Sequence, residues 1–266
     1  MHPLVENTLV WLIEAGLAAW PHEPPSASQL ERATIVAHRG ERDGVQVREN
    51  TFAAFDPVVA AGVGAIEFDI RYTRDDEPVV LHDATLKRVF GRSTRIDALS
   101  WRALRAEIPE IPHLAEMIER YSARSHLMIE LKTRGSERAE SRLYDWLSRL
   151  EPGAAFHVLS LDPALFAALA DLPSRAFIPV AKSNWRPIRD WARGHECGGA
   201  AGFFAQIRSA DIAHARAHDR VIGSGFIRRR GVLLREIGRG VPWIFTNQPL
   251  ALQRLLERQR SQHRQL

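Results

Sequence analysis

The feature that most constrains the fold is the alternation of short apolar runs with longer stretches of helical periodicity. Nine apolar runs have the length and composition of β-strands, at 34–37, 65–70, 79–81, 127–131, 156–159, 176–180, 201–204, 221–222 and 243–246. Helical stretches lie between many of them, at 51–61, 114–122, 137–150, 163–170 and 210–218. Repeated β–α alternation predicts a parallel sheet.

We expect this sheet to close into a TIM-like (β/α)8 barrel, with an open, doubly wound sheet as the alternative. A barrel needs eight strands, so one of the nine runs should be an accessory strand or no strand at all. Residues 4–20 are apolar on much of a helix circumference and are followed by three prolines at 21, 24 and 25. We therefore expect an N-terminal helical extension at 1–30 and a barrel domain at 31–266.

Composition limits the cellular setting more than the function. No uncharged apolar run reaches the roughly 18 residues that a membrane helix needs, so we expect no stable membrane insertion. The chain has one cysteine, Cys197, and no basic start of a signal peptide, which favours a cytoplasmic protein. The net charge of +4 comes from arginines spread along the whole chain, and we expect no nucleic-acid partner. The oligomeric state stays open.

Polar side chains follow the first four expected strands, at the point where each strand ends. They are His38 and Arg39, then Glu67 and Asp69, then His82, then Glu130 and Lys132. In a (β/α) barrel the carboxyl ends of the strands meet on one face, where active sites lie. The sequence thus places two histidines, three carboxylates and two cations at one mouth.

The three carboxylates predict a metal site. Glu67 and Asp69 are two residues apart on a strand and therefore point to the same side. Burying uncompensated carboxylates costs several kcal/mol or more, in order of magnitude, and a bound cation removes that cost. An all-oxygen site of Glu67, Asp69 and Glu130 suits one divalent cation, Mg²⁺ or Ca²⁺, better than zinc.

The remaining polar residues suit proton transfer to and from a phosphate ester. His38 and His82 have an intrinsic pKa near neutrality, and Arg39 and Lys132 can bind a phosphate. Each motif alone has an ordinary structural explanation, because a lone histidine at a strand end is often structural and a Glu-x-Asp pair is often solvated. Their joint occurrence in order at successive strand ends favours an active site.

These stretches together resemble the glycerophosphodiester phosphodiesterase family. The matching segments are Ala-His-Arg-Gly at 37–40, Glu-Asn-Thr at 49–51, Ile-Glu-Phe-Asp at 66–69, the run from 78 to 88 that contains His-Asp, Ile-Glu-Leu-Lys at 129–132, and a closing segment at 240–249. The resemblance covers roughly residues 34–255 and is most specific over 37–88 and 129–132.

The resemblance implies a TIM barrel, one divalent metal, and hydrolysis of a small phosphodiester substrate, a glycerophosphodiester, to sn-glycerol 3-phosphate and an alcohol. Its functional residues fall on His38 and His82 as the acid/base pair, on Glu67, Asp69 and Glu130 as metal ligands, and on Arg39 and Lys132 as phosphate contacts. Glu49 and Asn50 match a Glu-Asn pair that supports the site, and we expect Asn50 to bind substrate. Which histidine is the acid is left open.

Three departures from the family pattern affect the expected substrate. The loop at 40–49 is long, the segment 83–113 is short, and residues 221–226 lack the family's Trp-Thr-Val-Asn strand, with no aromatic residue at the expected place. We therefore expect a more open substrate wall. The alternatives are a phosphodiesterase that acts on lysophospholipids or on a sugar phosphodiester, and a catalytically silent barrel that binds phosphodiesters.

Overall fold

A computed structural model of the chain describes residues 16 and 23–264, so nearly all of the helix expected at 4–20 lies outside the described residues. Eight parallel strands form the barrel: β1 (Thr34–His38), β2 (Ala65–Tyr72), β4 (His126–Leu131), β5 (Phe156–Ser160), β6 (Phe177–Pro179), β7 (Gly199–Phe203), β8 (Val221–Gly225) and β9 (Trp243–Thr246). They are hydrogen-bonded in the order β6-β5-β4-β2-β1-β9-β8-β7. The two ends of this order meet where the Ala181 N–H donates to the Ala201 carbonyl at 2.7 Å. The expected barrel is confirmed, and an open sheet is excluded.

The ninth expected strand is an accessory strand, β3 (Pro78–Val80), which lies outside the barrel. It pairs antiparallel with the far end of β2, with Ile70 opposite Val80 and Tyr72 opposite Pro78. The prediction that His82 ends a barrel strand is therefore wrong. Because β3 runs back along β2, the chain returns to the mouth, and the Leu81 N–H donates to the Asp69 carbonyl at 3.0 Å. His82 reaches the mouth by this return.

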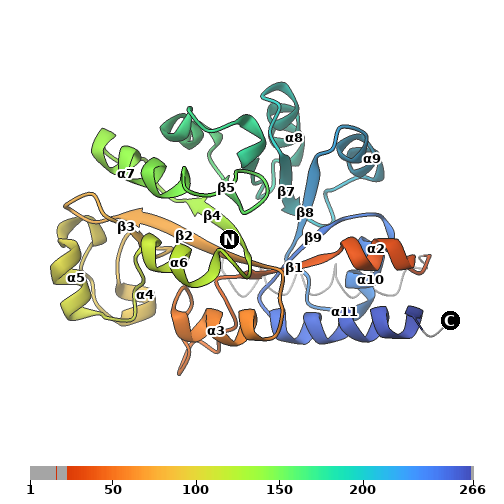
Figure 1. Cartoon of the computed structure of the whole chain (residues 1–266), viewed down its shortest axis with the longest axis horizontal. Helices are drawn as coiled ribbons and strands as arrows, with labels where there is room; N and C mark the ends of the chain where they lie inside the picture. Colours follow the sequence, from red (N-terminus) through yellow and green to blue (C-terminus); the bar gives the residue numbers. More distant parts are fainter. Residues whose placement is uncertain (1–15, 17–22, 265–266) are drawn as a thin grey trace.

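Helices surround the barrel (Figure 1). They are α2 (Ala27–Arg32), α3 (Phe52–Ala60), α6 (Leu114–Tyr121), α7 (Glu137–Leu147), α8 (Trp185–Gly194), α9 (Ser209–Ala217), α10 (Arg230–Gly238) and α11 (Pro249–Arg264). Several of these helices have a side-chain N-cap. The hydroxyls of Thr51 and Ser136 accept hydrogen bonds from backbone N–H groups of α3 and α7, respectively. The stretch expected as a helix at 163–170 is a 3-10 helix, Pro163–Leu169.

The helix α2 spans the boundary expected at residue 30 and packs on the barrel. Leu30 is fully buried, and the Arg260 guanidinium on α11 donates to the carbonyls of Leu30 and Ala33. None of the helices in the described part of the chain has the length and apolar character needed to cross a membrane.

Two hydrophobic cores lie on the two sides of the strands. The larger one fills the space between the strands and the helices, as expected for parallel strands that are buried on both faces. The smaller one has one residue from each of seven barrel strands: Val36, Ala65, Met128, Leu159, Ile178, Ala201 and Phe245. The barrel interior is thus packed with side chains, and the space for a ligand lies above it, at the carboxyl ends of the strands.

The excursion from β3 to α6 forms a small unit of its own beside the barrel. It contains α4 (Lys87–Phe90), a 3-10 turn (Ile96–Ala98) and α5 (Trp101–Glu107), which lie beyond β3 in Figure 1. Its apolar residues, among them Leu81, Leu86 and Leu104, form a separate core. This packing fixes the loop that carries His82.

Candidate active site

A cavity of about 410 Å³ opens at the carboxyl ends of the barrel strands. One half of its wall is polar and consists of His38, Arg39, Glu67, His82, Glu130 and Lys132, which belong to or follow β1, β2, β3 and β4. The other half is formed from β5 to β9 and the residues after them, and it is almost wholly apolar. No residue from 84 to 113 lines the cavity.

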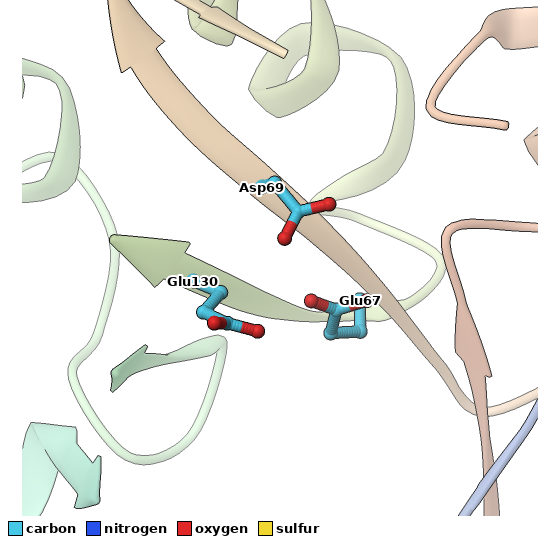
Figure 2. A group of neighbouring side chains, drawn as sticks. All are labelled: Glu67, Asp69 and Glu130. Atoms are coloured by element: carbon cyan, nitrogen blue, oxygen red, sulfur yellow. The ribbon is translucent and has the colours of Figure 1, made fainter. Parts of the chain in front are cut away.

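Three buried carboxylates converge at the polar end. Glu67 and Asp69 lie on β2, and Glu130 lies opposite Asp69 on the neighbouring strand β4. One carboxylate oxygen of each residue lies within 4.8 Å of the others, and Figure 2 shows the three side chains turned towards one another. The alternation of side chains along β2 produces this arrangement, as expected from the sequence.

The charges in this cluster fit a bound cation. One of its buried oxygens, Glu67 Oε1, has no hydrogen-bond partner among the described residues. Burial raises the pKa of Glu67 well above its ordinary value, and the charges of Asp69 and Glu130 raise it further. Burial also raises the pKa of Glu130. A divalent cation between the three carboxylates would coordinate Glu67 Oε1 and remove the repulsion, so the three carboxylates fit a metal site.

Arg39 and Lys132 contribute the positive charge of the site. Arg39 Nε lies 3.0 Å from one oxygen of Asp69, and Lys132 Nζ lies 3.1 Å from the other. Lys132 also donates to Glu130. Burial raises the pKa of Asp69, but Arg39 and Lys132 outweigh burial and lower it to about 2. Both cations also line the cavity, where a phosphate would meet them.

His38 faces the cavity with a fixed tautomer. Its Nδ1 lies 2.6 Å from Asn247 Oδ1, which also accepts from Arg42 at 3.0 Å. An amide oxygen can only accept a hydrogen bond, so Nδ1 of His38 carries the proton and its Nε2 has a free lone pair. Nε2 lies 3.8 Å from a carboxylate oxygen of Glu67. Burial, together with the charge of Arg39, lowers the pKa of His38 to about 3.

His82 also faces the cavity, but its partner is a carboxylate. Its Nδ1 lies 2.5 Å from Asp83 Oδ1, and Arg88 Nε donates to the other oxygen of Asp83 at 2.7 Å. Burial lowers the pKa of His82, although Asp69 and Asp83 act in the opposite direction. Each histidine thus has a hydrogen-bond partner at Nδ1. The partner of His38 is a neutral amide, whereas the partner of His82 is a charged carboxylate.

Asn50 does not lie where we expected it. It is buried and is not part of the cavity wall. Its backbone is left-handed, with φ 60°, and its amide donates to Asp69 Oδ2 at 2.7 Å. The turn that follows the long loop directs the amide towards β2. Asn50 therefore orients a carboxylate of the cluster, and a substrate contact is not supported.

The barrel closely resembles solved phosphodiesterase structures. A glycerophosphodiester phosphodiesterase from Thermotoga maritima superposes with a TM-score of 0.71 at 19% identity, over 84% of this chain and 98% of that one. A phosphodiesterase from Oleispira antarctica, solved in complex with the product sn-glycerol-3-phosphate, gives 0.71 at 20% identity, over 87% and 99%. At these identities the likeness shows the fold alone.

Sequence comparison finds a partial match to one enzyme family. The sequence model described as the glycerophosphoryl diester phosphodiesterase family matches residues 38–148, which include every site residue expected above. The putative glycerophosphodiester phosphodiesterase YhdW of Bacillus subtilis is 34% identical over 114 residues, 39% of this chain and 46% of that protein. Residues 38–148 of this chain are thus similar to the glycerophosphodiester phosphodiesterase family. A lysophospholipase D of Rattus norvegicus is 35% identical over 82 residues, 31% of this chain and 24% of that protein. The alignments thus span less than half the length of these curated relatives.

The site also contains candidate functional residues to which the sequence motifs assigned no role. Asn247, Asp83 and Arg88 lie within the segments 78–88 and 240–249 that resemble the family. Their position could therefore have marked them as candidate site residues, but their contacts depend on the fold. The segment 221–226 nonetheless contributes an aromatic residue to the wall. Phe226 directly follows β8, lines the cavity, and places its ring 4.6 Å from that of His38.

Proposed function

We propose that this chain is a metal-dependent phosphodiesterase that hydrolyses a glycerophosphodiester to glycerol 3-phosphate and an alcohol. The observation that carries the proposal is the convergence of two oriented histidines, three buried carboxylates and two cations on one cavity. The relatives described as glycerophosphodiester phosphodiesterases and the product held by the Oleispira antarctica enzyme support the substrate class.

The carboxylates and cations would bind the phosphate. Glu67, Asp69 and Glu130 would hold one Mg²⁺ or Ca²⁺, since all their donor atoms are carboxylate oxygens. When bound, the cation supplies charge neutralisation for the phosphate as the reaction proceeds. Arg39 and Lys132 contact phosphate oxygens and hold the group in place.

The partners of the two histidines favour different roles for them. Neutral His38, with a free lone pair on Nε2, takes the proton from the attacking hydroxyl. The attacker is water, or it is the substrate's own glycerol 2-hydroxyl, in which case a cyclic phosphate forms first and water then opens it to glycerol 3-phosphate. His82 donates a proton to the leaving oxygen as its bond to phosphorus breaks. We give His82 the acid role because the Asp83 carboxylate stabilises its protonated form, whereas His38 has only the Asn247 amide.

The direct test is a panel of phosphodiesters, incubated with the protein with and without EDTA and followed by phosphorus NMR. We expect cation-dependent release of glycerol 3-phosphate from at least one glycerophosphodiester. If every substrate in the panel is bound but none is hydrolysed at any cation concentration, the chain is instead a silent phosphodiester-binding barrel.

A second candidate substrate class is the lysophospholipids. The apolar half of the cavity favours it, because Leu161 and Phe226 are 46% and 43% exposed on that wall. An acyl chain laid on these side chains would gain about 25 cal/mol per Å² of buried apolar surface. A sugar phosphodiester fits this half poorly, because its hydroxyl groups would lose water without gaining hydrogen bonds.

A further inference from the structure

A continuous set of ionic contacts connects the phosphate-binding arginine to the second histidine around the outside of the cavity. Arg39 Nη1 donates to Glu49 Oε1 at 3.0 Å, and Arg88 Nη2 donates to the same oxygen at 2.6 Å. Arg88 Nε then binds Asp83, which lies against His82 Nδ1. We call Arg39, Glu49, Arg88, Asp83 and His82 the ion chain.

Arg88 is the centre of the ion chain, because it binds two carboxylates at once. Its Nη1 and Nη2 atoms donate hydrogen bonds to Glu49, and its Nε atom donates one to Asp83. A lysine has a single ammonium and cannot reproduce this planar, three-nitrogen arrangement. Burial raises the pKa of Glu49, but Arg88 and Arg39 outweigh burial and lower it to about 2, so Glu49 stays ionised.

Neither Glu49 nor Arg88 lines the cavity, so neither touches the reacting atoms. The Arg88 side chain is 49% exposed, and exposed ion pairs contribute little to folding stability. Asp83, in contrast, is next to His82 in the sequence and lies in a partly exposed loop. Without Arg88, its carboxylate is free to leave His82 Nδ1 for water.

We propose that Glu49 and Arg88 are positioning residues that hold Asp83 against His82 and, through Arg39, tie the orientation of the proton donor to the phosphate contact. The inference rests on the proposed function, since it needs His82 to protonate the leaving group. Partners of this kind fix a tautomer and a ring orientation, and their loss typically costs about 10–100-fold in activity.

The test compares two leaving groups on one substrate. Glycerophosphocholine releases an alcohol that needs a proton, whereas the p-nitrophenyl ester of glycerol 3-phosphate releases a phenolate that does not. We expect Arg88→Ala to lower kcat for the first by about 10–100-fold and for the second by less than about threefold. His82→Ala should show the same pattern with a larger loss.

A matched control and chemical rescue separate positioning from general damage. Arg92 lies four residues further on, is 52% exposed and pairs with Glu107, so Arg92→Ala should leave both rates unchanged. Because the Arg88 site is half exposed, added guanidinium should restore part of the activity of Arg88→Ala, whereas ammonium and Arg88→Lys should not. Asp83→Asn should repeat the leaving-group pattern and replaces Arg88→Ala if that variant does not fold.

The outcomes are distinguishable. Equal losses on both substrates in Arg88→Ala, or no loss on either, would overturn the positioning role. If His82→Ala itself shows no dependence on the leaving group, the acid role in the proposed function fails instead. Rescue by guanidinium together with a selective loss on the choline ester supports the ion chain.

Discussion

At the residue scale, Glu67 is the side chain whose charge is hardest to accommodate without a cation. We expect Glu67→Gln to weaken binding of Mg²⁺ and Ca²⁺ and to abolish most turnover, because it removes one of three carboxylate ligands. In EDTA the same variant should unfold at an equal or higher temperature than the unaltered chain, because Glu67 is repelled by Asp69 and Glu130. Titration calorimetry and thermal melting measure the two effects.

The control for this substitution is Glu140→Gln, since Glu140 lies on α7 away from the cavity and pairs with Arg134. It should bind metal and turn over substrate as the unaltered chain does. Full activity after exhaustive chelation would remove the metal from the mechanism.

The two histidines make a second prediction at this scale. His38→Ala and His82→Ala should each lower kcat by about 10²–10⁴-fold, the range for a lost general base or acid. The double variant should be far less damaged than the product of the two losses, because both groups act in one step. The p-nitrophenyl ester should rescue His82→Ala but not His38→Ala. Rescue of the other variant would exchange the two roles, and losses below about threefold in both would contradict the assignment.

At the element scale, a histidine pair joins the amino ends of β4 and β5. His126 Nε2 lies 2.8 Å from His157 Nδ1, and both rings pack against Trp243. Burial lowers the pKa of His126, and burial together with His126 lowers that of His157 to about 3. The folded state therefore favours neutral rings, and this stability is present above pH 6.5 and is lost as the pH falls towards 3.

Replacement of one ring tests this pair. Between pH 7 and pH 5, the free energy of unfolding of the unaltered chain should fall more steeply than that of His157→Gln, which has no ring to protonate. Urea unfolding at the two pH values measures the difference. Equal slopes for His157→Gln and the unaltered chain would show that folding does not lower the pKa of His157.

At the scale of the whole molecule, the division of the cavity into polar and apolar halves predicts substrate choice. We expect a higher kcat/KM for a lysophospholipid than for glycerophosphocholine, because only the larger substrate buries apolar surface on the wall that contains Leu161 and Phe226. Phe226→Ala should lower kcat/KM for the lysophospholipid more than for the small substrate.

This measurement needs the full chain and a variant that lacks residues 1–22. The deletion ends before α2, because Leu30 of that helix is part of the core. A strong preference for glycerophosphocholine in both proteins would contradict the prediction and show that the wall is closed to an acyl chain.

Much of the fold could be predicted because its signals are local. Each barrel strand is a short apolar run, and the helices α3 and α7 begin at hydroxyl residues that the sequence displays. The assignment of β3 failed because a run of apolar residues does not encode the direction of its pairing. The 3-10 helix at Pro163–Leu169 was mistaken for an α-helix, because its hydrophobic residues fit either period over so short a stretch.

The barrel and the cluster of Glu67, Asp69 and Glu130 could be inferred from local patterns, because side-chain direction along a strand follows from a period of two and parallel strands end on one face. The groups that orient the histidines could be identified only once the chain was folded. Asn247 is 209 residues from His38, and Arg88 is 39 from Glu49. Such contacts depend on which strands become neighbours when the barrel closes and on the paths of the loops. The local periodicity of apolar residues predicts neither of these.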